Sequence, residues 1–201
     1  MSITYAWPSN FKVGRFEMRV LPNVSAFTAP YTKSVQTLDM LGERWAVKLD
    51  LTIEGNPVLG AAREAFFDRL RGPINLIALW NIRFPVPQGT LRGSPTLAGA
   101  VAQLSNILSI TGGAAFSTLL AGDMLGVGAQ LVRVMANSTA DVNGLFASVE
   151  VMPRLRIAVA AGTSVAWNAP TANFMLKADG VPTSYTPEYA DVASLDMLEV
   201  F

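Results

Sequence analysis

Apolar and polar residues alternate along several stretches of the chain, and a period of two is typical of strands with one buried face. Every second residue from Trp45 to Ile53 is apolar, and residues 11–21 approach the same pattern. The segment between these stretches, residues 22–42, has room for two further short strands. The first quarter of the chain is therefore predicted to be β-structure.

The hydrophobic period changes to that of a helix after Ile53. Asn56 and Pro57 suit an N-cap and a first helical position, and Gly72-Pro73 would end the helix, so a helix is predicted over residues 57–71. Its apolar face would contain Leu59, Ala62, Phe66, Phe67 and Leu70. Its solvent side would contain Arg63, Glu64, Asp68 and Arg69. The apolar run INLIALW, residues 74–80, is then predicted as a strand that is buried on both faces.

Residues 130–156, QLVRVMANSTADVNGLFASVEVMPRLR, predict a β-hairpin. Two apolar strands, at 131–135 and 145–152, flank the turn sequence NSTADVNG, and Asn143-Gly144 is among the strongest short hairpin signals. Pro153 closes the second strand because it has no N–H to give to the ladder. The hairpin contains no reactive side chain, so we interpret it as a building element.

Proline and glycine mark two boundaries in the chain, at FPVPQGTLRGSP (residues 84–95) and WNAPTANF (residues 167–174). We expect a mainly β (α+β) fold with two domains. Residues 1–84 and 173–201 would form a β-sandwich or barrel core that the helix flanks. Residues 88–170 would form a small inserted β-barrel domain.

The composition excludes several classes of site. The chain of 201 residues has no cysteine, so it has neither disulfides nor thiolate metal sites, and it has no histidine. The usual general base near neutral pH, the usual zinc ligand and the middle member of a Ser-His-Asp triad are therefore all missing. We predict no catalytic residue, no cofactor site and no metal site.

The charges of the chain are few and balanced. Fifteen basic residues match fifteen acidic ones, which leaves no basic footprint for nucleic acid. Only 15% of the residues are charged while 51% are hydrophobic, so a monomer would have little polar surface to present. Burial between subunits would solve this problem, and a well-packed β protein is the alternative explanation.

No targeting or membrane segment is expected. The start MSITYAWPSNFKVG lacks the pattern of a secretory signal, so we expect cytoplasmic synthesis. Residues 93–122 carry no charge over thirty positions, but polar side chains and the Gly112-Gly113 pair interrupt the stretch too often for a membrane span.

The acidic residues of the insert have structural explanations. Asp123 and Asp141 occupy glycine-rich turns, where their carboxylates would bond local backbone amides. Glu150 lies on a strand and is expected to meet an arginine across the ladder.

Large and basic side chains supply the candidate contacts with other subunits. Trp45 and Trp80 fit core positions, whereas Trp7 stands near the N-terminus and could dock into a neighbouring subunit. Arg154 and Arg156 follow a strand end and are predicted subunit contacts, because arginine is enriched at interfaces. Phe146 is assigned to the same interface.

The order of elements resembles a family of tail-tip proteins of tailed bacteriophages, close to distal tail proteins. The resemblance covers residues 12–177 through LGERWAVKLDLTIE, FFDRLRGPINLIALW, PQGTLRGSP and the long stretch from LLAGDMLGVG to NFMLK, and it includes the ending LEVF. The first ten residues and residues 179–194 have no counterpart in the family pattern.

This resemblance implies a structural virion protein, without enzymatic activity, that is assembled in the host cytoplasm and located at the tail tip or baseplate. Such proteins form homo-oligomeric rings, commonly hexamers, that join the tail tube protein to the hub or tip proteins. DNA would only pass through the channel of the ring, and no membrane insertion is implied.

Two alternatives from other classes remain open. A tail module that binds host-surface carbohydrate would use the insert, with Trp167 or Phe146 stacking on a sugar. An enzyme without histidine would use a pair of carboxylates, such as Asp123 and Asp141.

Overall fold

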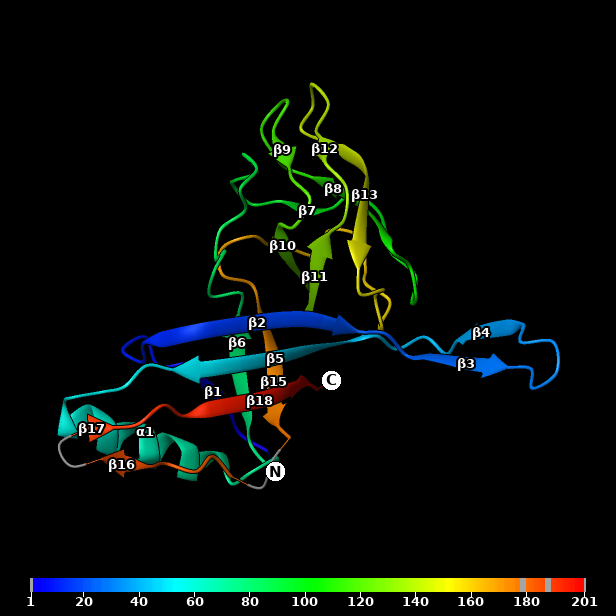
Figure 1. Cartoon of the computed structure of the whole chain (residues 1–201). Coiled ribbons are helices and arrows are strands. Elements are labelled where there is room, and N and C mark those ends of the chain that lie inside the picture. The colour runs from blue at the N-terminus through cyan, green and yellow to red at the C-terminus, as the bar shows by residue number, and fades with distance from the viewer. Residues whose placement is uncertain (1, 178–179, 187–188, 201) are drawn as a thin grey trace. The chain divides into compact units, whose positions relative to one another are not determined.

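The protein is described here by a computed structural model, which covers residues 2–177, 180–186 and 189–200 (Figure 1). Strands dominate, and α1 (Pro57–Leu70) is the one α-helix among the described residues. The predicted class, mainly β with one helix, is confirmed. No helix in the described part of the chain is long and apolar enough to cross a membrane.

The chain forms two compact units. The first contains Met1–Arg19, Trp45–Pro85 and Asn168–Phe201, and the second contains Val20–Arg44 and Val86–Trp167. The predicted insert, residues 88–170, overlaps the segment Val86–Trp167 of the second unit. The second unit also contains residues 20–44, which the prediction places in the core domain. Within the core segments predicted at 1–84 and 173–201, residues 1, 178–179, 187–188 and 201 lie outside the described residues.

A six-stranded sheet organises the first unit. Its strand order is β1 (Thr4–Ala6), β6 (Leu76–Trp80), β15 (Thr171–Leu176), β18 (Ser194–Glu199), β5 (Arg44–Leu51) and β2 (Val13–Leu21). The boundary between the units passes through β2 and falls after the first residue of β5. β1 pairs with β6 in parallel, whereas β6, β15, β18 and β5 pair antiparallel. In β6, buried and half-buried residues alternate, so the prediction of burial on both faces is wrong.

α1 begins where the sequence predicts and ends at Leu70, one residue before the predicted end, because Arg71 is a left-handed C-cap. The Oδ1 atom of Asn56 accepts a hydrogen bond from the N–H of Val58 at 3.0 Å, and Pro57 is the first helical residue. Phe66, Phe67 and Leu70 are buried, as expected, but Ala62, which was expected on the apolar face, is exposed, and Arg63, which was expected on the solvent side, is buried. The reason lies outside the helix, because Arg63 forms a buried ion pair with Glu54.

Aromatic side chains fill the space between α1 and the N-terminal segment of the first unit. Trp7, Phe11, Phe66 and Phe67 meet mostly edge to face, with ring centroids 5.5–6.5 Å apart. This arrangement suits the quadrupoles of the rings and adds to the free energy gained from burying their area. Residues near the N-terminus therefore belong to the core of the first unit.

The second unit contains a nearly closed barrel. Its sheet has the order β14 (Val165–Ala166), β10 (Met124–Val127), β11 (Gln130–Val134), β13 (Phe146–Met152), β8 (Ile107–Thr111) and β7 (Thr96–Leu97). A bridge between Thr96 and Ser164 brings the two outer strands of this sheet together. The short strands β9 (Thr118–Leu119) and β12 (Ser138–Thr139) form a separate pair. β11 and β13 pair antiparallel at Arg133–Met152 and Val134–Val151, which confirms the pairing of the two predicted strands. The simple turn predicted at 137–144 is wrong, because β12 lies within it and pairs with β9.

Two aspartates of the second unit bind backbone amides; the prediction of local partners is confirmed for Asp141, whereas Asp123 binds one local amide and two that are distant in the sequence. Asp123 is 2% exposed and accepts hydrogen bonds from the N–H groups of Gln88, Gly89 and Leu120. Asp141 accepts from the N–H groups of Asn143 and Leu145, which shapes the turn before β13. These hydrogen bonds lower the pKa of Asp141, chiefly the one from Leu145.

Glu150 lies on β13 between β8 and β11. Ile107 is opposite it on β8, and on β11 Arg133 pairs with Met152, two residues along β13 from Glu150.

Candidate interaction surface

The second unit carries a two-stranded hairpin formed by β3 (Val24–Thr28) and β4 (Val35–Asp39). The strands are in register from the pair Val24–Asp39 to the pair Thr28–Val35. At the turn, the N–H of Ala29 donates to the carbonyl oxygen of Ser34 at 2.9 Å, and Lys33 adopts a positive φ of 56°. The two short strands expected within residues 22–42 are therefore present.

Most side chains of this hairpin are exposed on both faces. Phe27 and Leu38 lie on one face and Val24 and Val35 on the other, because directly opposed residues of an antiparallel pair share a face. Phe27 is 60% exposed, and Tyr31 at the tip is 96% exposed. Exposed large apolar side chains that gather on one small element are typical of interaction sites.

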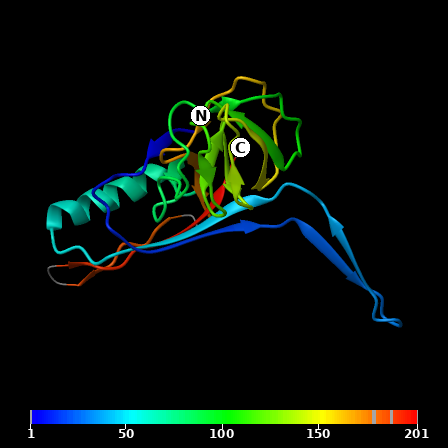
Figure 2. The same cartoon turned by 90° about the horizontal axis from the view of Figure 1, so that it is seen from above.

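The backbone edges of the hairpin are open as well. Within the described residues, β3 and β4 form a sheet of two strands (Figure 2). An isolated two-stranded hairpin is marginally stable in water, and unpaired edges readily accept another chain. The hairpin therefore has the properties of an element that is completed by another protein.

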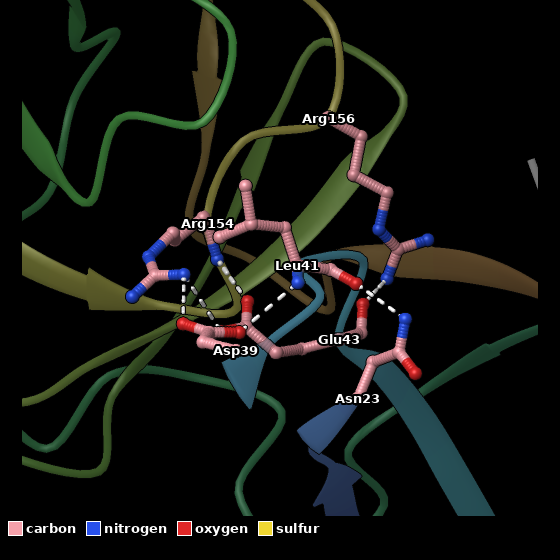
Figure 3. A network of polar contacts seen from close by, with 6 residues as sticks. All are labelled: Asn23, Asp39, Leu41, Glu43, Arg154 and Arg156. Atoms are coloured by element: carbon pink, nitrogen blue, oxygen red, sulfur yellow. Dashed lines mark hydrogen bonds and ion pairs between the residues drawn. The ribbon is translucent and has the colours of Figure 1, made fainter. Parts of the chain in front are cut away.

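Polar contacts fix the base of the hairpin to the segment that follows β13 in the same unit (Figure 3). The Nη1 atom of Arg154 lies 2.7 Å from Oδ2 of Asp39 and 3.6 Å from Oε1 of Glu43. The backbone N–H of Arg154 donates to Oε2 of Glu43 at 3.1 Å. Arg156 donates through its guanidinium to the carbonyl oxygen of Glu43. Arg154 thus contacts both Asp39, the last residue of β4, and Glu43, and Arg156 contacts Glu43.

The turn between Asp39 and Glu43 is held by further hydrogen bonds. The N–H of Leu41 donates to Oδ1 of Asp39 at 3.0 Å, and Nδ2 of Asn23 donates to the carbonyl oxygen of Leu41 at 2.7 Å (Figure 3). Leu41 is itself in the left-handed region with a φ of 59°. The direction in which the hairpin leaves its base is therefore specified by several contacts.

The electrostatics of this network favour the charged forms. The pKa of Asp39 is lowered, first by the hydrogen bond from Arg154 and then by the one from the Leu41 amide. The pKa of Arg154 is raised, and its hydrogen bond with Asp39 is the largest cause. Both groups therefore stay ionised at neutral pH.

The four residues that the sequence placed at a subunit interface lie in three environments. Arg154 and Arg156 come together in the hairpin network. Phe146 is 0% exposed in the barrel core, and Trp7 is 6% exposed in the aromatic cluster of the first unit. The prediction of subunit contacts is therefore wrong for Phe146 and Trp7, because neighbouring side chains of the same chain already cover them.

Trp167, the other candidate for a sugar platform, is half-buried in the second unit. Its Nε1–H donates to the carbonyl oxygen of Gly93 at 2.8 Å, and the guanidinium carbon of Arg92 lies 5.1 Å from its ring centroid. One face of the ring is therefore occupied by a cation–π contact.

Sequence reasoning missed the exposed side chains of the hairpin. A signal was present in residues 24–38, which contain one charged residue, Lys33, among several large apolar ones. Alternation predicted the two strands. It could not predict that they would stay uncovered by other strands or helices of the described chain.

Comparison of the chain with models of known protein families finds no matching family, and comparison with curated proteins finds no significant relative.

Proposed function

We propose that the chain is a structural subunit of a phage tail tip, which forms a ring between the distal end of the tail tube and the hub proteins. The observation that carries this proposal is the β3–β4 hairpin, with apolar side chains on both faces and both edges open. Such a hairpin is covered when copies of the chain and adjoining proteins assemble. The resemblance in the order of elements supplies the phage context.

The carboxylates of the second unit support a structural role. Asp123 accepts backbone hydrogen bonds from its own turn and from the distant residues Gln88 and Gly89, and Asp141 accepts two from its own turn. We therefore assign them to the stability of the loops and propose no reaction for them.

Immunoelectron microscopy of phage particles that contain the chain tests the location. We expect an antibody against the chain to label the far end of the tail, as a collar around the channel. Label on the capsid or along the tube, or particles without the chain, would contradict the proposal.

A double substitution tests the role of the hairpin. Phe27→Ser with Leu38→Ser should leave the melting temperature nearly unchanged, because both side chains are exposed, and should strongly reduce incorporation into particles. The matched control is Phe116→Ser with Val142→Ser, two exposed apolar residues on barrel loops of the same unit. Equal incorporation of the two double variants would count against the hairpin as an assembly element.

A further inference from the structure

The first unit contains an open apolar groove of about 810 Å³ beside the first turns of α1. Pro57, Gly60 and Ala61 line it from the helix, and Tyr185 and Tyr189 line it from the short strands β16 (Tyr185–Thr186) and β17 (Tyr189–Ala190). The volume is in the range that proteins use to hold a bound group. Glycine at position 60 keeps the groove floor close-packed, because a Cβ there would lie 3.3 Å from Cβ of Ala190.

Acidic side chains lie next to this groove. The hydroxyl of Tyr185 donates to Oε2 of Glu64 at 3.1 Å, and Thr186 donates to the carboxylate of Asp191. The nearby Glu54 is already neutralised by the buried guanidinium of Arg63. The described rim of the groove therefore has an unneutralised negative charge.

The hairpin tip in the second unit has complementary properties. Its apolar part is Pro30 and Tyr31, and nothing in the described chain covers the ring of Tyr31. Lys33 is the one charged residue in the sequence from Val24 to Leu38, and it is positive. An apolar tip with one cation thus matches an apolar groove with an acidic rim.

We propose that the tip of the β3–β4 hairpin docks into the α1 groove of a second copy of this chain. The proposal rests on the ring-forming function proposed above and names the contact that builds the ring. Tyr31 enters between Pro57 and the two tyrosines, and Lys33 pairs with Glu64. Because tip and groove are different surfaces, the contact is head-to-tail, and it closes into a ring when the rotation per subunit allows it.

Disulfide trapping tests this contact, because the natural chain has no cysteine to interfere. We would introduce Thr32→Cys at the tip and Ala61→Cys in the groove, and oxidise the purified full-length protein mildly at high concentration. A head-to-tail contact gives a ladder of dimers, trimers and larger species on a non-reducing gel. A mixture of the two single variants gives dimers only, because each copy then carries one cysteine.

The matched control replaces the groove cysteine with Ala62→Cys. Ala62 is also exposed on α1 but lines a different hollow, beside Phe11 and Phe66. We expect this pair to give several-fold less cross-linking. A disulfide within one monomer, dimers alone from the double-cysteine chain, equal yields from Ala61 and Ala62, or no cross-linking would each overturn the proposal.

A charge exchange gives an independent readout. Lys33→Glu or Glu64→Lys alone should slow the cross-linking of the cysteine pair by roughly two- to fivefold, the scale of an exposed ion pair. Both changes together should restore the rate, whereas additive losses would exclude the Lys33–Glu64 pair. If these tests fail while the antibody still labels the tail tip, the contact between tip and groove is excluded and the proposed function is retained.

Discussion

Replacement of Asp123 by asparagine should strongly destabilise the barrel of the second unit. The three hydrogen bonds of Asp123 are divided between its two oxygens, with Gln88 on Oδ1 and with Gly89 and Leu120 on Oδ2. An asparagine has one oxygen and one NH₂ group in their place. At least one backbone N–H would therefore face another donor.

The magnitude follows from the geometry. The Gln88 N–H lies 2.7 Å from Oδ1, so an asparagine whose oxygen turns to Gly89 and Leu120 loses a short, charge-assisted bond. That loss costs about 1.5–3 kcal/mol, and the two remaining bonds become weaker neutral ones, so we expect about 2–4 kcal/mol in all. For a unit of about one hundred residues this lowers the melting temperature by about 10–20 °C.

Calorimetry of the full chain measures this effect, and hydrogen exchange of the peptide 118–136 assigns it to the barrel. Asp141→Asn is the matched control. Both of its backbone bonds, from Asn143 and Leu145, end on the same oxygen, Oδ1. An asparagine at 141 can keep both bonds, so a much smaller shift is expected.

The result that would refute this reasoning is a melting temperature of Asp123→Asn within about 2 °C of the parent protein, which is under 1 kcal/mol. The same conclusion would follow if Asp123→Asn and Asp141→Asn shifted it equally. Either outcome would mean that the division of bonds over two oxygens does not determine the stability of the loop.

Three further predictions concern other contacts. The lowered pKa of Asp39 means that its bonds stabilise the hairpin base above the unfolded carboxyl pKa and are lost as the pH falls through the lower folded value. The difference in hydrogen exchange between Asp39→Asn and the parent should therefore be present near neutral pH and disappear only when the pH falls below the lowered folded pKa. Glu54→Gln leaves Arg63 buried without its partner and should cost about 3–5 kcal/mol in urea unfolding, and adding Arg63→Met should recover part of this loss. Gly144→Ala would push a Cβ into the carbonyl oxygen of Gly113 and should unfold the barrel at clearly lower urea than Gly128→Ala, which has a similar positive φ but open space around it.

Local patterns explain what could be predicted from the sequence. The cap at Asn56, the turn at Gly144 and the loop bonds of Asp141 each depend on residues within a few positions. Strand alternation likewise gave the β-rich class and the pairing of β11 with β13.

Long-range packing explains what could not be predicted. Arg63 has helical spacing that suits the solvent side, and only the approach of Glu54 makes its burial favourable. Phe146 and Trp7 are large apolar residues that fit an interface or a core equally well, and the neighbours that cover them come from distant segments. The exposed hairpin was missed for the converse reason, since its strands have the usual pattern but no third element within the described part of the chain pairs with them.

The division of the chain into two units limits how one unit can be exchanged by recombination. The backbone passes from one unit to the other four times, after Arg19, Arg44, Pro85 and Trp167. A gene segment for residues 86–167 would encode every strand of the barrel sheet but would omit Asp39 and Glu43, the acidic partners of Arg154. Recombination that exchanges this unit between related genes must therefore transfer two separate segments together, or the recipient loses the support of its hairpin.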